Sequence, residues 1–277
     1  MATMVEGIDG LFTAEGKTVL VTGGATGIGR MVATAFVQAG ARVLIASRKA
    51  ASCAAAAEDL NAQGYPGTAE GFGGDVASQK GVAALVAEIH GRTDRLDVLV
   101  NNAGRSWGAP YEAFPWQGWQ KVMDLNVAGL FHLTRDLTDL LAASASPDQP
   151  ARIINIGSVM GAVPLGDSAY SYAASKAAVH HLTRILAKEL AGRAITVNAL
   201  APGPFESRMT AFATSDAETA RRTAEAVPAG RLGAPENVAA AVLFLAGRGG
   251  AYTTGAILPL DGGIGVQTGP ELFEHAR

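Results

Sequence analysis

Three residues with acid–base or hydrogen-bonding side chains stand close together in the second half of the chain. Ser158 ends an apolar run, Tyr172 follows fourteen residues later, and Lys176 comes four residues after Tyr172. In an α-helix a spacing of four places two side chains on the same face. A free tyrosine titrates near pH ~10 and a nearby ammonium favours the phenolate, so this pair could exchange a proton near neutrality. Ser158 could hydrogen-bond a substrate oxygen on which negative charge develops.

These residues alone leave alternatives open. A tyrosine and a lysine four residues apart also occur as an exposed pair on an amphipathic helix. Tyr170 is a second tyrosine, but it lies six residues before Lys176 and off the same helical face. Asn126 is a polar residue in a long helical stretch, where it could be a surface residue or a core amide that binds a backbone carbonyl.

A glycine-rich turn near the start of the chain is typical of dinucleotide binding. The apolar run Thr18–Thr22 leads into a turn that opens a helix expected over Ile28 to Ala39, with the residues Gly23, Gly24, Ala25, Thr26, Gly27, Ile28 and Gly29. Glycine lets the backbone approach a pyrophosphate closely, and a helix N-terminus offers free N–H groups. The spacing Gly-x-x-x-Gly-x-Gly differs from the common Gly-x-Gly-x-x-Gly, and an ordinary tight turn is the alternative.

The residues after the second strand predict which dinucleotide would bind. Folds that bind NAD usually have an acidic residue there, which accepts from the ribose hydroxyls. This chain has Ser47, Arg48 and Lys49 instead. Arg48 offers a planar donor fork for a 2′-phosphate, and the two neighbours are further donors. The pattern therefore predicts NADP, with surface residues that bind nothing as the alternative.

Two more polar turns are expected at the same edge of the sheet, where ligands bind in open α/β folds. They contain Asp75 and Val76 after the third strand, and Asn101, Asn102, Ala103 and Gly104 after the fourth. The aspartate could accept from the adenine amino group, and the second turn could brace the glycine-rich loop. Ordinary turn chemistry is the alternative, because Asn, Asp and Gly are common in turns.

These sites need a frame of strands and helices to bring them together. Apolar runs predict strands at Thr18–Thr22, Val43–Ser47, Asp97–Asn101, Arg152–Ile156, Ile195–Leu200 and Ile257–Leu260, with a weaker one near Thr68–Phe72. Such runs separated by helices indicate an α/β fold with a parallel sheet covered on both faces. The segment Pro204–Gly233 interrupts the alternation at the end of a strand, where a substrate lid would lie.

The composition argues against several classes of protein. The 277 residues are 48% hydrophobic and carry a net charge of −3, which argues against nucleic-acid binding. Cys53 is the only cysteine, so an internal disulfide and a cysteine-based zinc site are excluded, no metal is expected, and a buried or half-buried thiol is the favoured reading. No secretory signal and no apolar stretch of about 18 residues stands in the sequence, so a cytoplasmic protein is expected.

Taken together, these motifs resemble those of the short-chain dehydrogenases/reductases. The resemblance covers roughly Leu11 to Gly263 and rests on Thr22-Gly23-x-x-x-Gly27-x-Gly29, Asn101-Asn102-Ala103-Gly104, Asn126, Ser158, Tyr172-x-x-x-Lys176 and Pro202-Gly203. It implies one doubly wound Rossmann domain at 11–263 with a seven-stranded parallel sheet, a small helical lid at about 204–233, and terminal extensions at 1–10 and 264–277. It also implies a tetrad of Asn126, Ser158, Tyr172 and Lys176, in which the asparagine carbonyl holds a water and the lysine holds the nicotinamide ribose.

A narrower resemblance implies a substrate class. Asn155-Ile156-Gly157-Ser158, Leu186–Leu190 and Ala201–Thr210 are similar to bacterial 3-oxoacyl-thioester reductases, and Trp107-Gly108 and Gly118-Trp119 to members that serve rhamnolipid-type synthesis. The expectation is an NADP(H)-dependent reductase of 3-oxoacyl or other apolar ketones. The alternatives are a dehydrogenase of aryl, terpenoid or steroid-like alcohols and a cofactor-sensing regulator, although a regulator would usually lack the tyrosine or the lysine.

The resemblance also assigns the remaining site residues. Pro202, Gly203, Phe205 and Ser207 are expected at the nicotinamide, and Thr26 stands where many NADP-using members have a basic residue. An apolar substrate pocket is expected from Trp107, Met160, Leu165, Phe205 and Met209, with core packing as the alternative. The helices around Trp116–Ala142 and Tyr172–Ala191 correspond to the family's four-helix interface, so a homotetramer is expected, with a dimer as the alternative.

Overall fold

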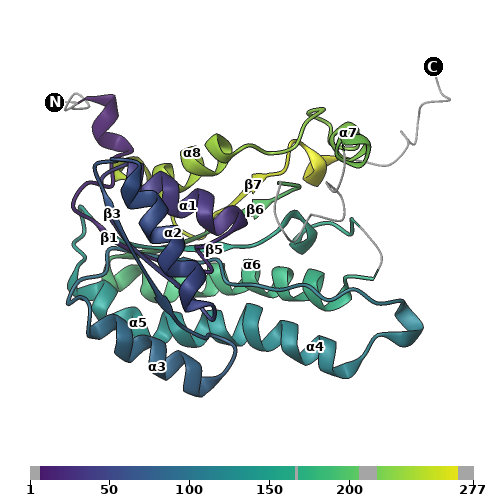
Figure 1. The fold of residues 1–277 in the computed structure, drawn as a ribbon, viewed down its shortest axis with the longest axis horizontal. Helices are drawn as coiled ribbons and strands as arrows, with labels where there is room; N and C mark the ends of the chain where they lie inside the picture. Colours follow the sequence, from purple (N-terminus) through teal and green to yellow (C-terminus); the bar gives the residue numbers. More distant parts are fainter. Residues whose placement is uncertain (1–6, 166–167, 206–216, 268–277) are drawn as a thin grey trace.

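One sheet of seven parallel strands forms the centre of the molecule (Figure 1). The computed structural model describes residues 7–165, 168–205 and 217–267. The strands are β1 (Thr18–Thr22), β2 (Arg42–Ser47), β3 (Thr68–Gly73), β4 (Val98–Asn101), β5 (Ala151–Ile156), β6 (Ile195–Pro202) and β7 (Ile257–Leu260). Their order is β3-β2-β1-β4-β5-β6-β7, and every pair of neighbours is parallel. The order reverses between β1 and β4, which is where ligands bind in open α/β sheets.

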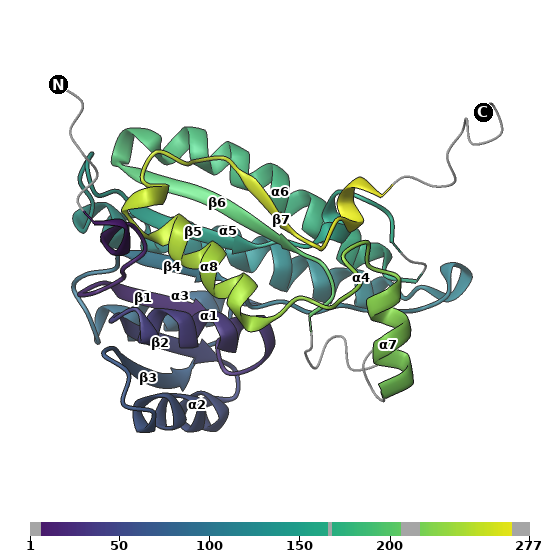
Figure 2. The same cartoon turned by 90° about the horizontal axis from the view of Figure 1, so that it is seen from above.

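Helices cover both faces of this sheet. They are α1 (Gly27–Gln38), α2 (Ala50–Ala62), α3 (Gln79–His90), α4 (Trp116–Met123), α5 (Leu130–Ala143), α6 (Tyr170–Leu190), α7 (Ala217–Glu225) and α8 (Pro235–Ala246). α1, α2 and α8 lie on one face, and α3, α5 and α6 lie on the other (Figures 1 and 2). The predicted doubly wound α/β fold is therefore confirmed. No helix in the described ranges is both long and apolar enough to cross a membrane.

Successive side chains of a strand point to opposite faces of the sheet, so the protein has two separate hydrophobic cores. In β1, Val19 and Val21 pack with α1 and α8, whereas Leu20 packs with α3 and α5 on the opposite face. Every residue of β1, β4, β5 and β6 is buried, which explains the continuous apolar runs in the sequence. Burying an aliphatic side chain of this size contributes about 1.5–3 kcal/mol. Cys53 belongs to the core under α2, so the prediction of a buried thiol is confirmed.

The predicted bounds of β1 and β7 agree with the observed ones, and those of the other strands differ by one or two residues. Asp97 was expected in a strand but precedes β4, and its carboxylate accepts a 2.8 Å hydrogen bond from the backbone N of Thr18. β6 extends to Pro202, two residues beyond the predicted end. α1 begins and ends one residue early, and Gly40 follows it with φ +87°, a conformation that favours glycine and terminates the helix.

The sequence predicted one long helical stretch before β5. In the structure this stretch is interrupted and is not a continuous α-helix. A π-helical turn, Asp124–Gly129, separates α4 from α5. At Gly129 the helix lies against the loop after β3, where a Cβ atom would stand only 2.0 Å from the carbonyl oxygen of Val76. Turns of this kind are often found at functional sites, and this one contains Asn126.

Candidate active site

The four expected tetrad residues come from three segments of the chain on one side of the sheet. Ser158 follows β5, Tyr172 and Lys176 lie in the first two turns of α6, and Asn126 lies in the π-helical turn. Asn126, Ser158 and Lys176 are buried and Tyr172 is half-buried. The fold therefore brings together residues that are fifty positions apart in the sequence.

Lys176 is held at the end of β5. Its Nζ donates a 2.7 Å hydrogen bond to the carbonyl oxygen of Ile156. The loop after β4 is on its other side, where a Cβ atom on Gly104 would be 3.7 Å from Nζ. Burial lowers the pKa of the Lys176 ammonium to about 8, because the charged form loses hydration. The site therefore carries a positive charge at neutral pH, and loses it as the pH rises through about 8.

Tyr172 differs from its sequence-based expectation. Burial raises the pKa of its phenol, and the hydrogen bond with Ser158 lowers it only in part. The Lys176 ammonium lies over the face of the Tyr172 ring, 5.5 Å from its centre. Tyr172 is consequently a neutral phenol at neutral pH. That is the form needed to donate a proton.

Asn126 connects the loop after β4 to α6. Its Oδ1 accepts from the backbone N of Arg105, and its Nδ2 donates to the carbonyl oxygen of Arg105 and to the Oγ of Ser175, each at 2.9 Å. Ser175 in turn donates to the carbonyl oxygen of Tyr172 at 2.7 Å. Asn126 therefore acts as a buried core amide, and the groups it holds adjoin Tyr172 and Lys176.

His180 was not singled out from the sequence, although it lies four residues after Lys176 on α6. It is buried, and in the described part of the chain its Nε2 has no hydrogen-bond partner. A Cβ atom on Gly157 would be 2.3 Å from this nitrogen, and one on Gly161 would be 2.8 Å from Cε1. Burial, with Lys176 and Arg184 nearby, lowers the pKa of His180 to about 4. The neutral ring therefore fills a slot beneath the segment that carries Ser158.

The glycine-rich turn has the geometry that a pyrophosphate requires. Gly23 and Gly27 have φ +68° and +55°, and a Cβ atom on Gly29 would be 2.3 Å from the carbonyl oxygen of Gly23. The N-cap residue of α1, Thr26, makes no side-chain cap hydrogen bond, which leaves the first N–H groups of the helix available. Asn102 donates to the carbonyl oxygens of Thr22 and Gly23 at 2.9 and 3.1 Å, as expected of a residue that braces this loop.

The expected adenosine residues lie at the ends of β2 and β3. Ser47 Oγ is 3.0 Å from the Sγ of Cys53 and accepts from the backbone N of Lys49. The side chains of Arg48 and Lys49 are exposed, and neither pairs with a carboxylate in the ranges described. Asp75 accepts from the backbone N of Ala77 at 3.1 Å. Two cations therefore stand free beside β2, and no acidic residue follows this strand.

The residues expected to form the substrate pocket are spread over several environments. Trp107 packs on Gly118 of α4, where a Cβ atom would be 2.8 Å from the indole Nε1. Met160 is half-buried against Val159 and its neighbours, whereas the side chain of Leu165 is 45% exposed. Two further residues expected at the site, Ser207 and Met209, lie outside the described residues.

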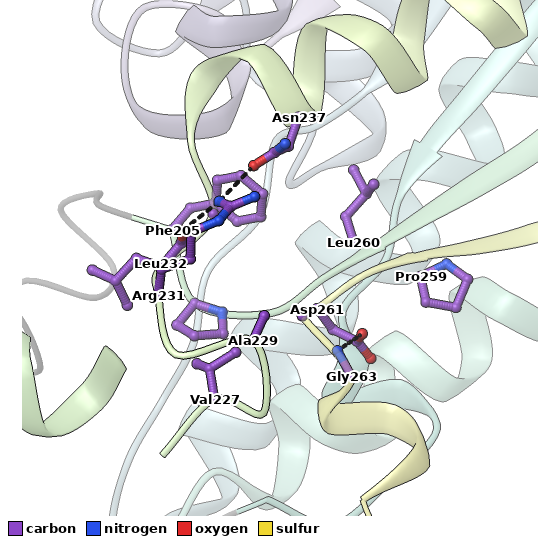
Figure 3. A pocket seen from close by; sticks show the side chains of 13 residues that line it. Phe205, Val227, Ala229, Arg231, Leu232, Asn237, Pro259, Leu260, Asp261 and Gly263 are labelled. Carbon is purple, nitrogen blue, oxygen red and sulfur yellow. Dashed lines mark hydrogen bonds between the residues drawn. The ribbon is translucent and has the colours of Figure 1, made fainter. Parts of the chain in front are cut away.

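Phe205 is buried beside a cavity of about 350 Å³ (Figure 3). Its ring lies over Gly233, where a Cβ atom would be only 2.3 Å from Cζ. Arg231 stands at the cavity and donates to Asn237 Oδ1 at 3.1 Å, and the Asp261 carboxylate accepts from the backbone N atoms of Gly263 and Gly265. None of the four expected catalytic residues lines this cavity, but Pro204 and Phe205, from the segment expected at the nicotinamide, do.

A glycine-rich strand-to-helix turn and a serine, tyrosine and lysine at the same edge of the sheet define an α/β oxidoreductase that uses a nicotinamide dinucleotide. A family model described as Enoyl-(Acyl carrier protein) reductase matches residues 23–265. The chain belongs to the short-chain dehydrogenase/reductase family, as the motifs had predicted.

Two relatives and one solved structure are similar to this chain over about nine tenths of its length. A Pseudomonas aeruginosa protein named Rhamnolipids biosynthesis 3-oxoacyl-[acyl-carrier-protein] reductase is 47% identical over 91% of this chain and 98% of the relative. Galactitol 2-dehydrogenase (L-tagatose-forming) of Cereibacter sphaeroides is 38% identical over 92% of the chain and 98% of its own length. Among solved structures, the Pseudomonas aeruginosa RhlG/NADP active-site complex matches with a TM-score of 0.88 and 46% identity, over 92% of this chain and 99% of that one.

Proposed function

We propose that this protein is an NADPH-dependent reductase that converts a 3-oxoacyl thioester to the 3-hydroxyacyl thioester. The observation that carries the proposal is the neutral phenol of Tyr172 beside Ser158 and the buried Lys176 ammonium. The similarity to a 3-oxoacyl reductase over nearly the whole of both chains supports this substrate class. A dehydrogenase of bulky alcohols is not favoured, and a regulator is disfavoured because Asn126 and the three other tetrad residues are all present.

Ser158, Tyr172 and Lys176 have different roles in the proposed reaction. Ser158 orients the substrate by donating a hydrogen bond to the carbonyl oxygen of the ketone. Tyr172 donates a proton to the same carbonyl oxygen as negative charge develops on it. Lys176 holds a positive charge beneath the phenol, which favours loss of the phenolic proton in the reaction. The reduced nicotinamide, when bound, supplies the hydride. We expect it to contact Lys176, Gly104 and the segment from Pro202 to Phe205.

The substrate class can be tested by following NADPH consumption with a panel of ketones. The panel contains acetoacetyl thioesters, ethyl benzoylformate, cyclic diketones and a keto sugar such as L-tagatose. We expect the thioester to have the highest kcat/KM. A preference for the keto sugar or for a cyclic diketone would replace the proposed substrate class, and no turnover of any ketone would contradict a reductase.

The free cations after β2 predict the choice of cofactor. We expect the wild type to prefer NADPH over NADH. Arg48→Asp should reduce this preference by about tenfold or reverse it, because it removes a charge-assisted hydrogen bond to the 2′-phosphate, and such a bond is worth about 1.5–3 kcal/mol. The measurement is kcat/KM for both cofactors at a saturating ketone. Arg248→Asp is the matched control, since Arg248 is exposed in the turn between α8 and the amino end of β7, away from β2. Equal efficiency of the wild type with both cofactors would contradict the assignment.

We also propose a homotetramer in the cytoplasm, with residues 11–263 as the dinucleotide-binding domain and 204–233 as its lid. The lid follows β6 at the carboxyl edge of the sheet and leads into α8. α6 is long and has Ile185 exposed at 49%, so it offers apolar surface for a second copy. Light scattering is expected to give four times the mass of the chain. A monomer at micromolar concentration would contradict this assembly.

A further inference from the structure

Exposed aromatic side chains are concentrated beside the candidate active site. Eight large apolar side chains are exposed in the described residues, and four of them belong to the two segments that flank the start of α6: Tyr111, Trp116, Trp119 and Leu165. Tyr111 and Trp116 are each 75% exposed. Monomeric proteins rarely expose contiguous apolar surface of this kind unless something binds to it.

The rings are ordered rather than scattered. Tyr111 and Phe114 both approach the ring of Tyr170 edge-on, with centroids 5.8 and 5.6 Å away, and Trp119 approaches Phe114 at 6.3 Å. A hydrogen bond from the backbone N of Ala109 to the carbonyl oxygen of Ser168 joins the two segments. We call these four rings, together with the exposed Trp116 at the start of α4, the aromatic cluster. The segment that carries Tyr111 projects past the end of α4 in both views (Figures 1 and 2).

Two segments connect the aromatic cluster with the expected catalytic residues. Tyr170 and Tyr172 both lie in the first turn of α6, about 3 Å apart along its axis, with their side chains on different faces of the helix. The other segment begins at Gly104, near Lys176, and at Arg105, whose backbone is bonded to Asn126. The segment from Gly104 to Tyr111 therefore leads from Lys176 and Asn126 to these rings, which is the path that a long substrate would follow.

We propose that the aromatic cluster binds the alkyl chain of the substrate, so that the enzyme prefers medium or long 3-oxoacyl chains over acetoacetyl. This inference rests on the proposed function and makes its substrate class narrower. The cluster presents ring faces and edges, and the charged residues of this region are single ones such as Glu112 and Lys121, which suits a hydrocarbon better than an anion. Full burial of a methylene is worth about fourfold in binding, so six more carbons on a half-open surface should give at least about tenfold.

The kinetic test compares 3-oxobutanoyl and 3-oxodecanoyl thioesters with NADPH. In the wild type, kcat/KM should be at least tenfold higher for the longer chain, and Tyr111→Ser with Trp116→Ser should remove most of that gain while changing the short substrate less than twofold. Both side chains are largely exposed, so their loss should not unfold the protein. Tyr252→Ser is the matched control, because Tyr252 is fully exposed just before β7, at the opposite edge of the sheet.

A binding measurement keeps the test independent of turnover. The chain has three tryptophans, and all of them lie between residues 107 and 119. Tryptophan fluorescence titrated with butanoyl and decanoyl thioesters, which carry no ketone, should show tighter binding of the longer chain, and Tyr111→Ser should weaken only that binding. If decanoyl binds tightly but no 3-oxo thioester is reduced, the proposed function fails and the alkyl site stands.

Three results would overturn the alkyl site. Equal affinity of the wild type for both acyl chains would do so, as would a chain-length preference that survives in the double variant. Dissociation of the assembly by Tyr111→Ser, seen by light scattering without a change in chain-length preference, would show instead that a second copy of the chain covers these rings.

Discussion

Replacing Tyr172 by phenylalanine is expected to lower kcat by about 100-fold or more, the usual contribution of a positioned general acid. The change removes one oxygen and leaves the ring to pack. It should not disturb the fold, because Ser158 Oγ keeps its 3.2 Å hydrogen bond from the backbone N of Met160. The binding of NADPH should also survive, so kcat at saturating cofactor and the dissociation constant of NADPH are the two quantities to measure.

Three companion variants show whether the loss comes from the proton donor. Lys176→Ala should be at least as harmful, since it removes the buried positive charge beneath the phenol. Tyr252→Phe removes the same oxygen from a fully exposed tyrosine and should leave kcat unchanged. Tyr170→Phe keeps the ring contacts of the aromatic cluster, so an inactive Tyr170→Phe beside a normal Tyr172→Phe would transfer the proton-donor role to Tyr170.

The sheet could be predicted because its strands are buried on both faces. Runs such as Thr18–Thr22 in β1 contain only apolar or β-branched residues and are followed by turn residues, so neither an alternating pattern nor long-range information was needed to find them. The glycine-rich turn and the tyrosine–lysine pair were visible for the same reason, because each is a local spacing within one turn or one helix. The order of the strands, in contrast, could not be predicted from such runs and is seen only in the structure.

Features that depend on contacts between distant segments were not visible in the sequence. The π-helical turn arises where Gly129 meets the loop after β3, some fifty residues earlier in the chain. The raised pKa of Tyr172 comes from burial, and a spacing of four says only that a lysine is on the same face. The contact of Tyr111 with Tyr170 likewise joins segments that no local pattern connects.

The slot that holds His180 illustrates how a packing residue escapes sequence reasoning. Its one sequence signal is the spacing of four from Lys176, which a surface histidine would share. The structure adds two glycines, Gly157 and Gly161, that stand on either side of Ser158 and leave just enough room for the ring. Glycines in such a place appear in the sequence as ordinary turn residues, because their purpose depends on a side chain from another element.

Removal of the Asn126 side chain by Asn126→Ala is expected to lower both stability and activity. The change leaves the N and O of Arg105 and the Oγ of Ser175 without their buried partner. Unpaired buried groups of this kind cost about 1–3 kcal/mol, so the free energy of unfolding in urea should fall by about that amount. kcat should fall by about 100-fold, since a displacement of about 1 Å in a catalytic group can cost that much.

A matched control separates the positioning of the site from general stability. Asn198 is equally buried, and its side chain donates to the carbonyl oxygen of Thr253 at 2.7 Å and accepts from the backbone N of Ala256 at 3.0 Å. These bonds join β6 to the segment before β7, away from the tetrad. Asn198→Ala should therefore lose a similar free energy of unfolding and keep its kcat. If both variants lost activity in proportion to their stability, Asn126 would be a core amide alone, and the connection from Arg105 through Ser175 to Tyr172 would have no part in positioning the phenol.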